Sequence, residues 1–356
     1  MKAARILSLA ATSLLLGSCS GAPLPSDLER AQQFELDEQD DEALSAWRAI
    51  RESCPRPDAR PHDDCGIAAM REAQLLERLG RYPEAAAAWE ALPERTTDRS
   101  RAARGLVRAA EITAEKLADP SHAAASAWAC VERWPDEVAA DDALALALRI
   151  ALRIDGARDP RGTLARLDAL AKKLLTAEIV DNLLVAAARI ARTLGDFDGA
   201  VARFDEVDKR FPHSGLVDDA NFQAAEILRG RGDPKGAITR LDRILHTKRR
   251  ALIVGSYNAM LLDDAQLLEG QVELDDLHDV PGAIAALTKL VDNYPDSNLR
   301  DDALLEIARA HLAAHAPPTE GDSKAACVAL ARLVKQFPDG NRVRAARAKQ
   351  SELGCP

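Results

Sequence analysis

The sequence predicts an all-α protein, an α-solenoid of about eight helical hairpins followed by a C-terminal capping helix. Three observations lead to this prediction. Alanine and leucine, which are strong helix formers, dominate the composition, while aromatic residues make up only 4%. A pair of one small and one large residue recurs along the chain, and residues typical of helix starts and stops recur beside it. No stretch shows the sustained alternation of a β-strand.

The recurring pair is a small residue followed four positions later by a large apolar one, so that both lie on one helix face. The small member lets a neighbouring helix approach, and the large member fills the space beside it. Eight such pairs occur: Ala43/Trp47, Ala85/Trp89, Ala124/Trp128, Thr163/Leu167, Ala200/Phe204, Ala237/Leu241, Ala283/Leu287 and Ala326/Leu330. The large members stand 37 to 46 residues apart, which predicts one packing position in each of eight units.

Residues that mark helix boundaries recur at a similar spacing. Five aspartates stand four residues before a small member, where a carboxylate can cap a helix N-terminus: Asp159, Asp196, Asp233, Asp279 and Asp322. Four aromatic-proline dipeptides follow and predict helix ends: Trp134-Pro135, Phe211-Pro212, Tyr294-Pro295 and Phe337-Pro338. The expected unit is therefore a helix, a tight turn, a second helix and a proline-marked turn.

These motifs resemble known repeats. Gly80-Arg81-Tyr82-Pro83-Glu84-Ala85, with Trp89 following, resembles the turn and second helix of a tetratricopeptide repeat. Phe211-Pro212-His213-Ser214 and Tyr294-Pro295-Asp296-Ser297 are similar to the longer repeats of outer-membrane-assembly lipoproteins and Tol–Pal coordinator proteins. The resemblance covers nearly all of residues 27 to 353. It implies a non-catalytic scaffold that binds protein partners of the cell envelope.

The first residues have the form of a secretory signal. Lys2 and Arg5 precede an apolar run from Ile6 to Leu16, which is too short to span a bilayer that needs about 20 residues. The run ends in Leu16-Gly17-Ser18-Cys19, which resembles the lipobox of bacterial lipoproteins. That resemblance implies cleavage before Cys19 and lipidation of its thiol; an ordinary signal peptide is the alternative.

The expected organisation follows from that motif. Residues 1–18 form the signal peptide, 19–26 a lipidated tether, and 27–356 the solenoid, with a bend expected near 246–255. Ser20 in place of aspartate implies sorting to the outer membrane, facing the periplasm. Without Lys2 and Arg5 the chain has 45 basic and 57 acidic residues, a net charge of −12. Such acidity argues against nucleic-acid binding and against attachment to a membrane surface through basic residues. We therefore expect the lipid to make the membrane contact.

The other cysteines form two candidate disulfides. Cys54 and Cys65 flank a proline-rich loop, and Cys327 and Cys355 lie where antiparallel helices would bring them together. Free, half-buried thiols are the alternative for each pair. Cys130 is interpreted as a buried small apolar residue.

No motif predicts a catalytic, cofactor or metal site. His311 and His315 are spaced for one helix face, but the glutamate of a zinc-protease motif is missing between them. Three of the Asp-Asp pairs occupy the same repeat position, which favours a structural role over acid–base chemistry. The alternative to a scaffold is a periplasmic glycan- or peptide-binding lipoprotein. Against glycan binding, Trp47, Trp89 and Trp128 occupy expected packing positions.

Overall fold

The computed structural model describes residues 26–59, 61–154, 158–246 and 260–356. These residues form seventeen α-helices, three 3₁₀ helices and no strand. The α-helices are α1 (Asp27–Leu36), α2 (Asp40–Glu52), α3 (Asp64–Arg78), α4 (Tyr82–Ala91), α5 (Arg99–Glu115), α6 (Pro120–Arg133), α7 (Ala139–Arg153), α8 (Pro160–Leu174), α9 (Val180–Thr193), α10 (Phe197–Arg210), α11 (Val217–Gly230), α12 (Pro234–His246), α13 (Met260–Asp275), α14 (Val280–Asn293), α15 (Arg300–Ala313), α16 (Glu320–Gln336) and α17 (Val343–Leu353). The 3₁₀ helices are η1 (Pro57–Ala59), η2 (Pro61–Asp63) and η3 (Leu92–Glu94).

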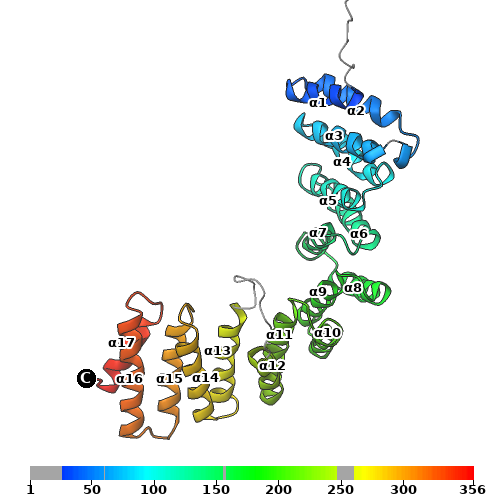
Figure 1. The fold of residues 1–356 in the computed structure, drawn as a ribbon. Helices are drawn as coiled ribbons and strands as arrows, with labels where there is room; N and C mark the ends of the chain where they lie inside the picture. Colours follow the sequence, from blue (N-terminus) through cyan, green and yellow to red (C-terminus); the bar gives the residue numbers. More distant parts are fainter. Residues whose placement is uncertain (1–25, 60, 155–157, 247–259) are drawn as a thin grey trace, which may run out of the picture. The chain divides into compact units, whose positions relative to one another are not determined.

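Consecutive helices pair as hairpins, from α1/α2 to α15/α16, and α17 packs on α16 (Figure 1). This confirms the predicted solenoid of eight hairpins and a capping helix. The chain divides into two compact units, Met1–Ala129 and Cys130–Pro356. Within each unit the hairpins follow one another in chain order (Figure 1). None of the helices in the described ranges is long and apolar enough to cross a membrane.

The second helix of every hairpin carries one of the predicted packing positions. The eight large side chains are at most 6% exposed: Trp47, Trp89, Trp128, Leu167, Phe204, Leu241, Leu287 and Leu330. Each of these side chains packs into the core from the helix face that also carries the small residues. The hairpins therefore stack through alternating small and large side chains, as the spacing requires.

The third hairpin departs from the expected register. Asp119 caps α6 by accepting a hydrogen bond from the His122 N–H at 3.0 Å, and Ala123, four residues after Asp119, is fully buried. The predicted small member, Ala124, is only partly buried. Trp128 is buried nonetheless, five residues after Ala123. A run of alanines satisfies the pattern in either register, so the sequence alone does not separate them.

Four second helices begin with the same Asp-x-x-Gly arrangement. Asp159, Asp196, Asp233 and Asp279 each accept a hydrogen bond from the glycine N–H three residues later, at 2.8 to 3.0 Å. A Cβ on Gly162 would lie 2.0 Å from the Asp159 carboxylate, so glycine leaves room for the cap. These four predicted caps are confirmed.

The fifth predicted cap is wrong. Thr319 is the N-cap of α16, and Asp322 lies in its first turn, where the two side chains form a capping box. The helix therefore starts one turn earlier than the aspartate spacing indicated. The predicted ends are correct: α6, α10, α14 and α16 each stop one residue before the aromatic of an aromatic-proline pair.

Some predictions lie outside the described residues. These are the signal peptide, Cys19 with its tether up to residue 25, and most of the bend expected near 246–255.

Candidate functional site

A groove of about 300 Å³ opens on the N-terminal unit between α2, α3 and α4. Its lining consists of arginine, glutamate, alanine and leucine only: Arg48, Arg51, Ala69, Glu72, Leu76, Glu84, Ala87, Ala88, Ala91 and Arg95. The charged residues stand on three successive helices and on the turn after η3. The groove therefore places guanidinium and carboxylate groups above an apolar floor.

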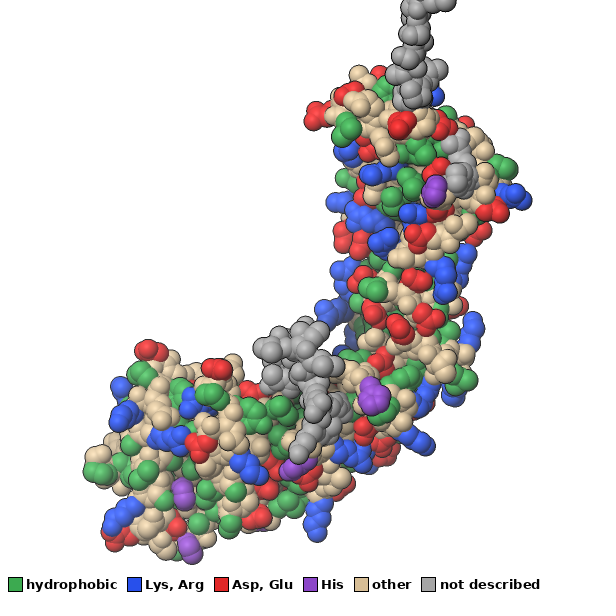
Figure 2. Space-filling view, in the orientation of Figure 1, with side chains coloured by type: hydrophobic (Ala, Val, Ile, Leu, Met, Phe, Trp, Pro, Cys, Tyr) green, Lys and Arg blue, Asp and Glu red, His purple; other side chains and the backbone are tan. Residues whose placement is uncertain are grey.

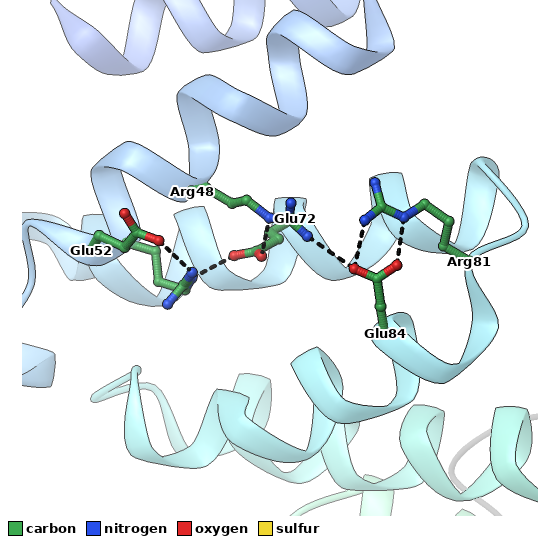
Figure 3. A network of polar contacts seen from close by, with 6 residues as sticks. Arg48, Glu52, Glu72, Arg81 and Glu84 are labelled. Atoms are coloured by element: carbon green, nitrogen blue, oxygen red, sulfur yellow. Dashed lines mark hydrogen bonds and ion pairs between the residues drawn. The ribbon is translucent and has the colours of Figure 1, made fainter.

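Glu72 of α3 is the centre of this groove. Its side chain is buried, yet both carboxylate oxygens are bonded: Arg48 Nε donates at 2.8 Å and Arg51 Nε at 2.5 Å. Figure 3 shows this carboxylate held between the two guanidinium groups from α2. Hydrogen bonds between charged groups are stronger than neutral ones, so the pair offsets the cost of burying the charge.

Arg48 extends the network to α4. Its Nη2 lies 3.4 Å from Glu84, whose carboxylate also accepts a hydrogen bond from Arg81 Nε at 2.7 Å (Figure 3). The hydrogen bond from Arg81 is the main reason that the pKa of the Glu84 carboxyl lies below its ordinary value. The network therefore ties α2, α3 and α4 together and fixes the guanidinium groups at the groove. Such groups can bind carboxylates or amide oxygens of a partner segment.

A second polar feature links tryptophans of the N-terminal unit to glutamates twelve residues earlier. Trp47 Nε1 donates to Glu35 at 2.5 Å, and Trp89 Nε1 donates to Glu77. Glu77 also pairs with Arg108 of the next hairpin at 2.5 Å. The sequence analysis missed these glutamates, although their repeated spacing from tryptophan was a usable signal.

The tryptophans of the chain are all buried. Trp47, Trp89, Trp128 and Trp134 are between 0% and 8% exposed. They are held inside the hairpins, so they do not form an exposed aromatic platform of the kind on which sugars stack.

The structure joins the two cysteine pairs that the sequence singled out. The Cα atoms of Cys54 and Cys65 lie 6.0 Å apart, and those of Cys327 and Cys355 lie 5.5 Å apart, both with bonded sulfurs. Cys130 is buried and unbonded to another cysteine, and burial raises the pKa of its thiol to about 12. Oxidation of the two pairs in the cell stays a prediction.

The histidine and aspartate pairs have structural partners. His315 Nδ1 lies 2.9 Å from the Asp322 carboxylate, beside the N-terminus of α16. In the ranges that the structure describes, no three histidine, cysteine, aspartate or glutamate side chains form a metal-binding group. The Asp-Asp pairs bind neighbouring hairpins: Asp219 pairs with Arg189 at 2.6 Å, and Asp302 with Arg342 at 2.5 Å.

Residues 264–297 and 302–340 match the tetratricopeptide repeat family. The first segment spans most of α13 and all of α14, and the second spans α15 and α16, so each match covers one hairpin. The C-terminal part of the chain therefore carries two tetratricopeptide repeats, and the other helix pairs form a solenoid of the same type. Repeats of this class generally act as protein-binding scaffolds, because stacked hairpins expose an extended surface.

Three solved structures are similar to the chain at low sequence identity. A tetratricopeptide repeat protein from Parabacteroides merdae has 12% identity over 79% of this chain and 97% of its own, with a TM-score of 0.33. The C-terminal part of a repeat-containing protein from Cytophaga hutchinsonii has 12% identity over 89% and 98%, with a TM-score of 0.41. Yeast Tom70 has 13% identity over 91% and 90%, with a TM-score of 0.36. No curated protein matches the chain.

Proposed function

We propose that the chain is a non-catalytic scaffold that binds other proteins in the bacterial cell envelope, held at the outer membrane by a lipid on Cys19. The observation that carries this proposal is the stack of hairpins, two of which match tetratricopeptide repeats. Their exposed side chains are mixed in sign: Figure 2 shows acidic and basic groups interspersed over the visible face of each unit. A surface of this kind suits specific polar contacts with a partner.

The location rests on two further features. Leu16-Gly17-Ser18-Cys19 resembles a lipobox, and the two cysteine pairs lie at bonding distance, which suits an oxidising compartment such as the periplasm. The similarity to outer-membrane-assembly and Tol–Pal proteins points to the same compartment. Burial of the tryptophans disfavours the alternative of a glycan-binding lipoprotein.

The test is a cross-linked pulldown from detergent-solubilised membranes, with the Cys19→Ser variant as the matched control. We expect the unaltered chain to float with membranes at high salt and to retain specific envelope proteins. The Cys19→Ser variant should become soluble in the periplasm while keeping the same partners. A variant that still floats would contradict lipid anchoring, and a chain that captures nothing reproducibly would contradict the scaffold.

A further inference from the structure

A second cleft, of about 410 Å³, lies in the C-terminal unit between α7 and α9, with the start of α8 beside it. Leu148 and Leu152 of α7 line it together with Ile190 of α9 and Leu194, the residue that follows α9. Ile190 is 4% exposed and forms part of the floor, whereas Leu194 is 37% exposed at the edge. The volume falls in the range of about 300–1,000 Å³ that is usual for ligand pockets.

Between the first helices of five other pairs of consecutive hairpins, an ion pair joins the two helices. We call each such line of contact a seam. The pairs are Arg71–Glu35 between α1 and α3, Arg108–Glu77 between α3 and α5, Arg192–Glu226 between α9 and α11, Arg229–Asp275 between α11 and α13, and Arg309–Asp275 between α13 and α15. These seams are therefore bridged by side chains of the protein itself.

Among the residues that the structure describes, no ion pair joins α7 to α9. When α7, α9 and α11 are aligned on their first aspartates, Leu152 stands where α9 has Arg192, and Arg189 stands where α11 has Glu226. A leucine and a cation thus replace the arginine and the glutamate of the next seam. Among the described residues of α7 and α9, the side-chain hydrogen bond that joins them lies at their starts, from Asn182 to Asp141 at 2.9 Å.

Cationic side chains edge this cleft. Arg153 and Arg158 both line it and are both exposed. Neither makes an ion pair or a hydrogen bond with a residue that the structure describes. None of the described residues that line this cleft is acidic, although the chain as a whole has a net charge of −10.

We propose that this cleft binds an acidic, leucine-bearing segment of a partner protein. An apolar side chain of that segment would pack against Leu148, Leu152 and Ile190, while its carboxylates would pair with Arg153 and Arg158. Charge complementarity selects this occupant, because it brings to the seam the carboxylate that the next seam, between α9 and α11, obtains from Glu226 of the chain itself. The inference deepens the scaffold function proposed above and rests on it.

The probe is a fluorescent peptide of about 12 residues built from leucine and glutamate, titrated with the full chain and followed by fluorescence anisotropy. We expect the double variant Arg153→Glu/Arg158→Glu to bind at least about tenfold more weakly. The same variant should bind a leucine-lysine peptide that the unaltered chain rejects. Leu152→Glu should also abolish binding, because the new carboxylate can pair with Arg189 and close the seam.

The matched control for Leu152→Glu is Val328→Glu. It also replaces an apolar residue with one carboxylate, but at a residue of α16 that is 69% exposed. It should leave peptide affinity unchanged. Thermal melts check that each variant folds. If Leu152→Glu does not fold, the double variant Arg153→Glu/Arg158→Glu, which changes exposed residues, still tests whether the cleft binds the acidic peptide.

Two results would overturn the proposal. One is absence of peptide binding at about 1 mM, or equal binding by the charge-reversed variant. The other is a concentration-dependent dimer that Leu152→Glu disperses, since the occupant would then be a second copy of the chain. The scaffold is tested separately by the pulldown: if the charge-reversed variant retains every partner, the cleft assignment fails while the scaffold stands.

Discussion

In the N-terminal unit the buried Glu72 of α3 has an arginine on each carboxylate oxygen, whereas in the C-terminal unit two glutamates of α13 have none. Glu269 is 8% exposed and accepts a hydrogen bond from Gln266. Glu273 has a buried oxygen, Oε2, without a hydrogen-bond partner. Burial raises the pKa of both carboxyl groups, that of Glu273 to about 7, and the charge of Glu269 adds to the shift at Glu273.

The difference shows that a first helix can bury a carboxyl group in two ways. In α3 the carboxylate accepts hydrogen bonds from two arginines of α2 and ties the two helices together. In α13 burial raises the pKa of the carboxyl groups of Glu269 and Glu273, so their contribution to stability depends on pH.

The largest expected effect tests how each unit fills its packing position. Trp89→Ala should lower the free energy of unfolding by about 3–5 kcal/mol, and Leu287→Ala by about 2–5 kcal/mol. Trp89→Phe should cost only about 1 kcal/mol, because it keeps most of the buried area and loses the bond to Glu77. Urea unfolding measures all three. An unchanged urea midpoint for Trp89→Ala would mean that the Trp89 side chain does not contribute to the stability of the core.

Removal of the disulfide in each unit should cause the next largest loss of stability. The chain-entropy argument assigns about 3.5 kcal/mol to the Cys327–Cys355 bond and about 3 kcal/mol to Cys54–Cys65. Cys355→Ser should act mainly on α17, which packs on one neighbour, and hydrogen exchange should quicken there first. Non-reducing peptide mapping of periplasmic protein comes first, because free thiols in both pairs would remove the basis of this prediction.

Glu72→Gln tests the ion-paired carboxylate directly. Loss of one partner from a fully buried pair costs about 3–5 kcal/mol, but the arginines are 34% and 26% exposed, so we expect about 1–2 kcal/mol. Glu52→Gln, at a side chain that is 67% exposed, is the control and should change stability by less than about 0.5 kcal/mol. Equal effects of the two substitutions would show that burial of Glu72 adds nothing.

Glu273→Gln tests the unpaired carboxyl group and should have the smallest effect. The folded-state pKa of about 7 lies above the ordinary 4.5, so the proton stabilises the fold below about pH 4.5 and that stability is lost as pH rises through 7. The variant should therefore be about 1 kcal/mol more stable than the unaltered chain at pH 8, since partial exposure reduces the full effect, and nearly equal at pH 5. If the variant and the unaltered chain differed in stability by the same amount at both pH values, packing and not ionisation would be the cause. Glu352→Gln is the control at an exposed glutamate.

The sequence predicted the parts of this fold that depend on neighbours within a helix. The spacing of Asp159, Asp196, Asp233 and Asp279 located four helix starts, because an N-cap and its N–H donor are three residues apart. Prediction failed at α6, where consecutive alanines fit two registers, and at α16, where Thr319 and Asp322 both suit a cap.

The groove of the N-terminal unit could not be predicted in the same way. Arg48 reaches Glu72 and Glu84 across 24 and 36 residues, and nothing local distinguishes these side chains from other surface charges. The cleft between α7 and α9 is visible only when the seams are compared, since Leu152 on its own is one leucine among many.

The Asp-x-x-Gly helix starts have a consequence for how such an array changes through time. In these four starts the glycine leaves room for the carboxylate, since a Cβ would lie 2.0 to 2.2 Å from it in three starts and 2.8 Å from it in the fourth. A larger residue at the glycine position would therefore displace the carboxylate from the cap in these starts. Because the signal lies within four consecutive residues, a hairpin that is duplicated or exchanged by recombination carries its own starting point with it.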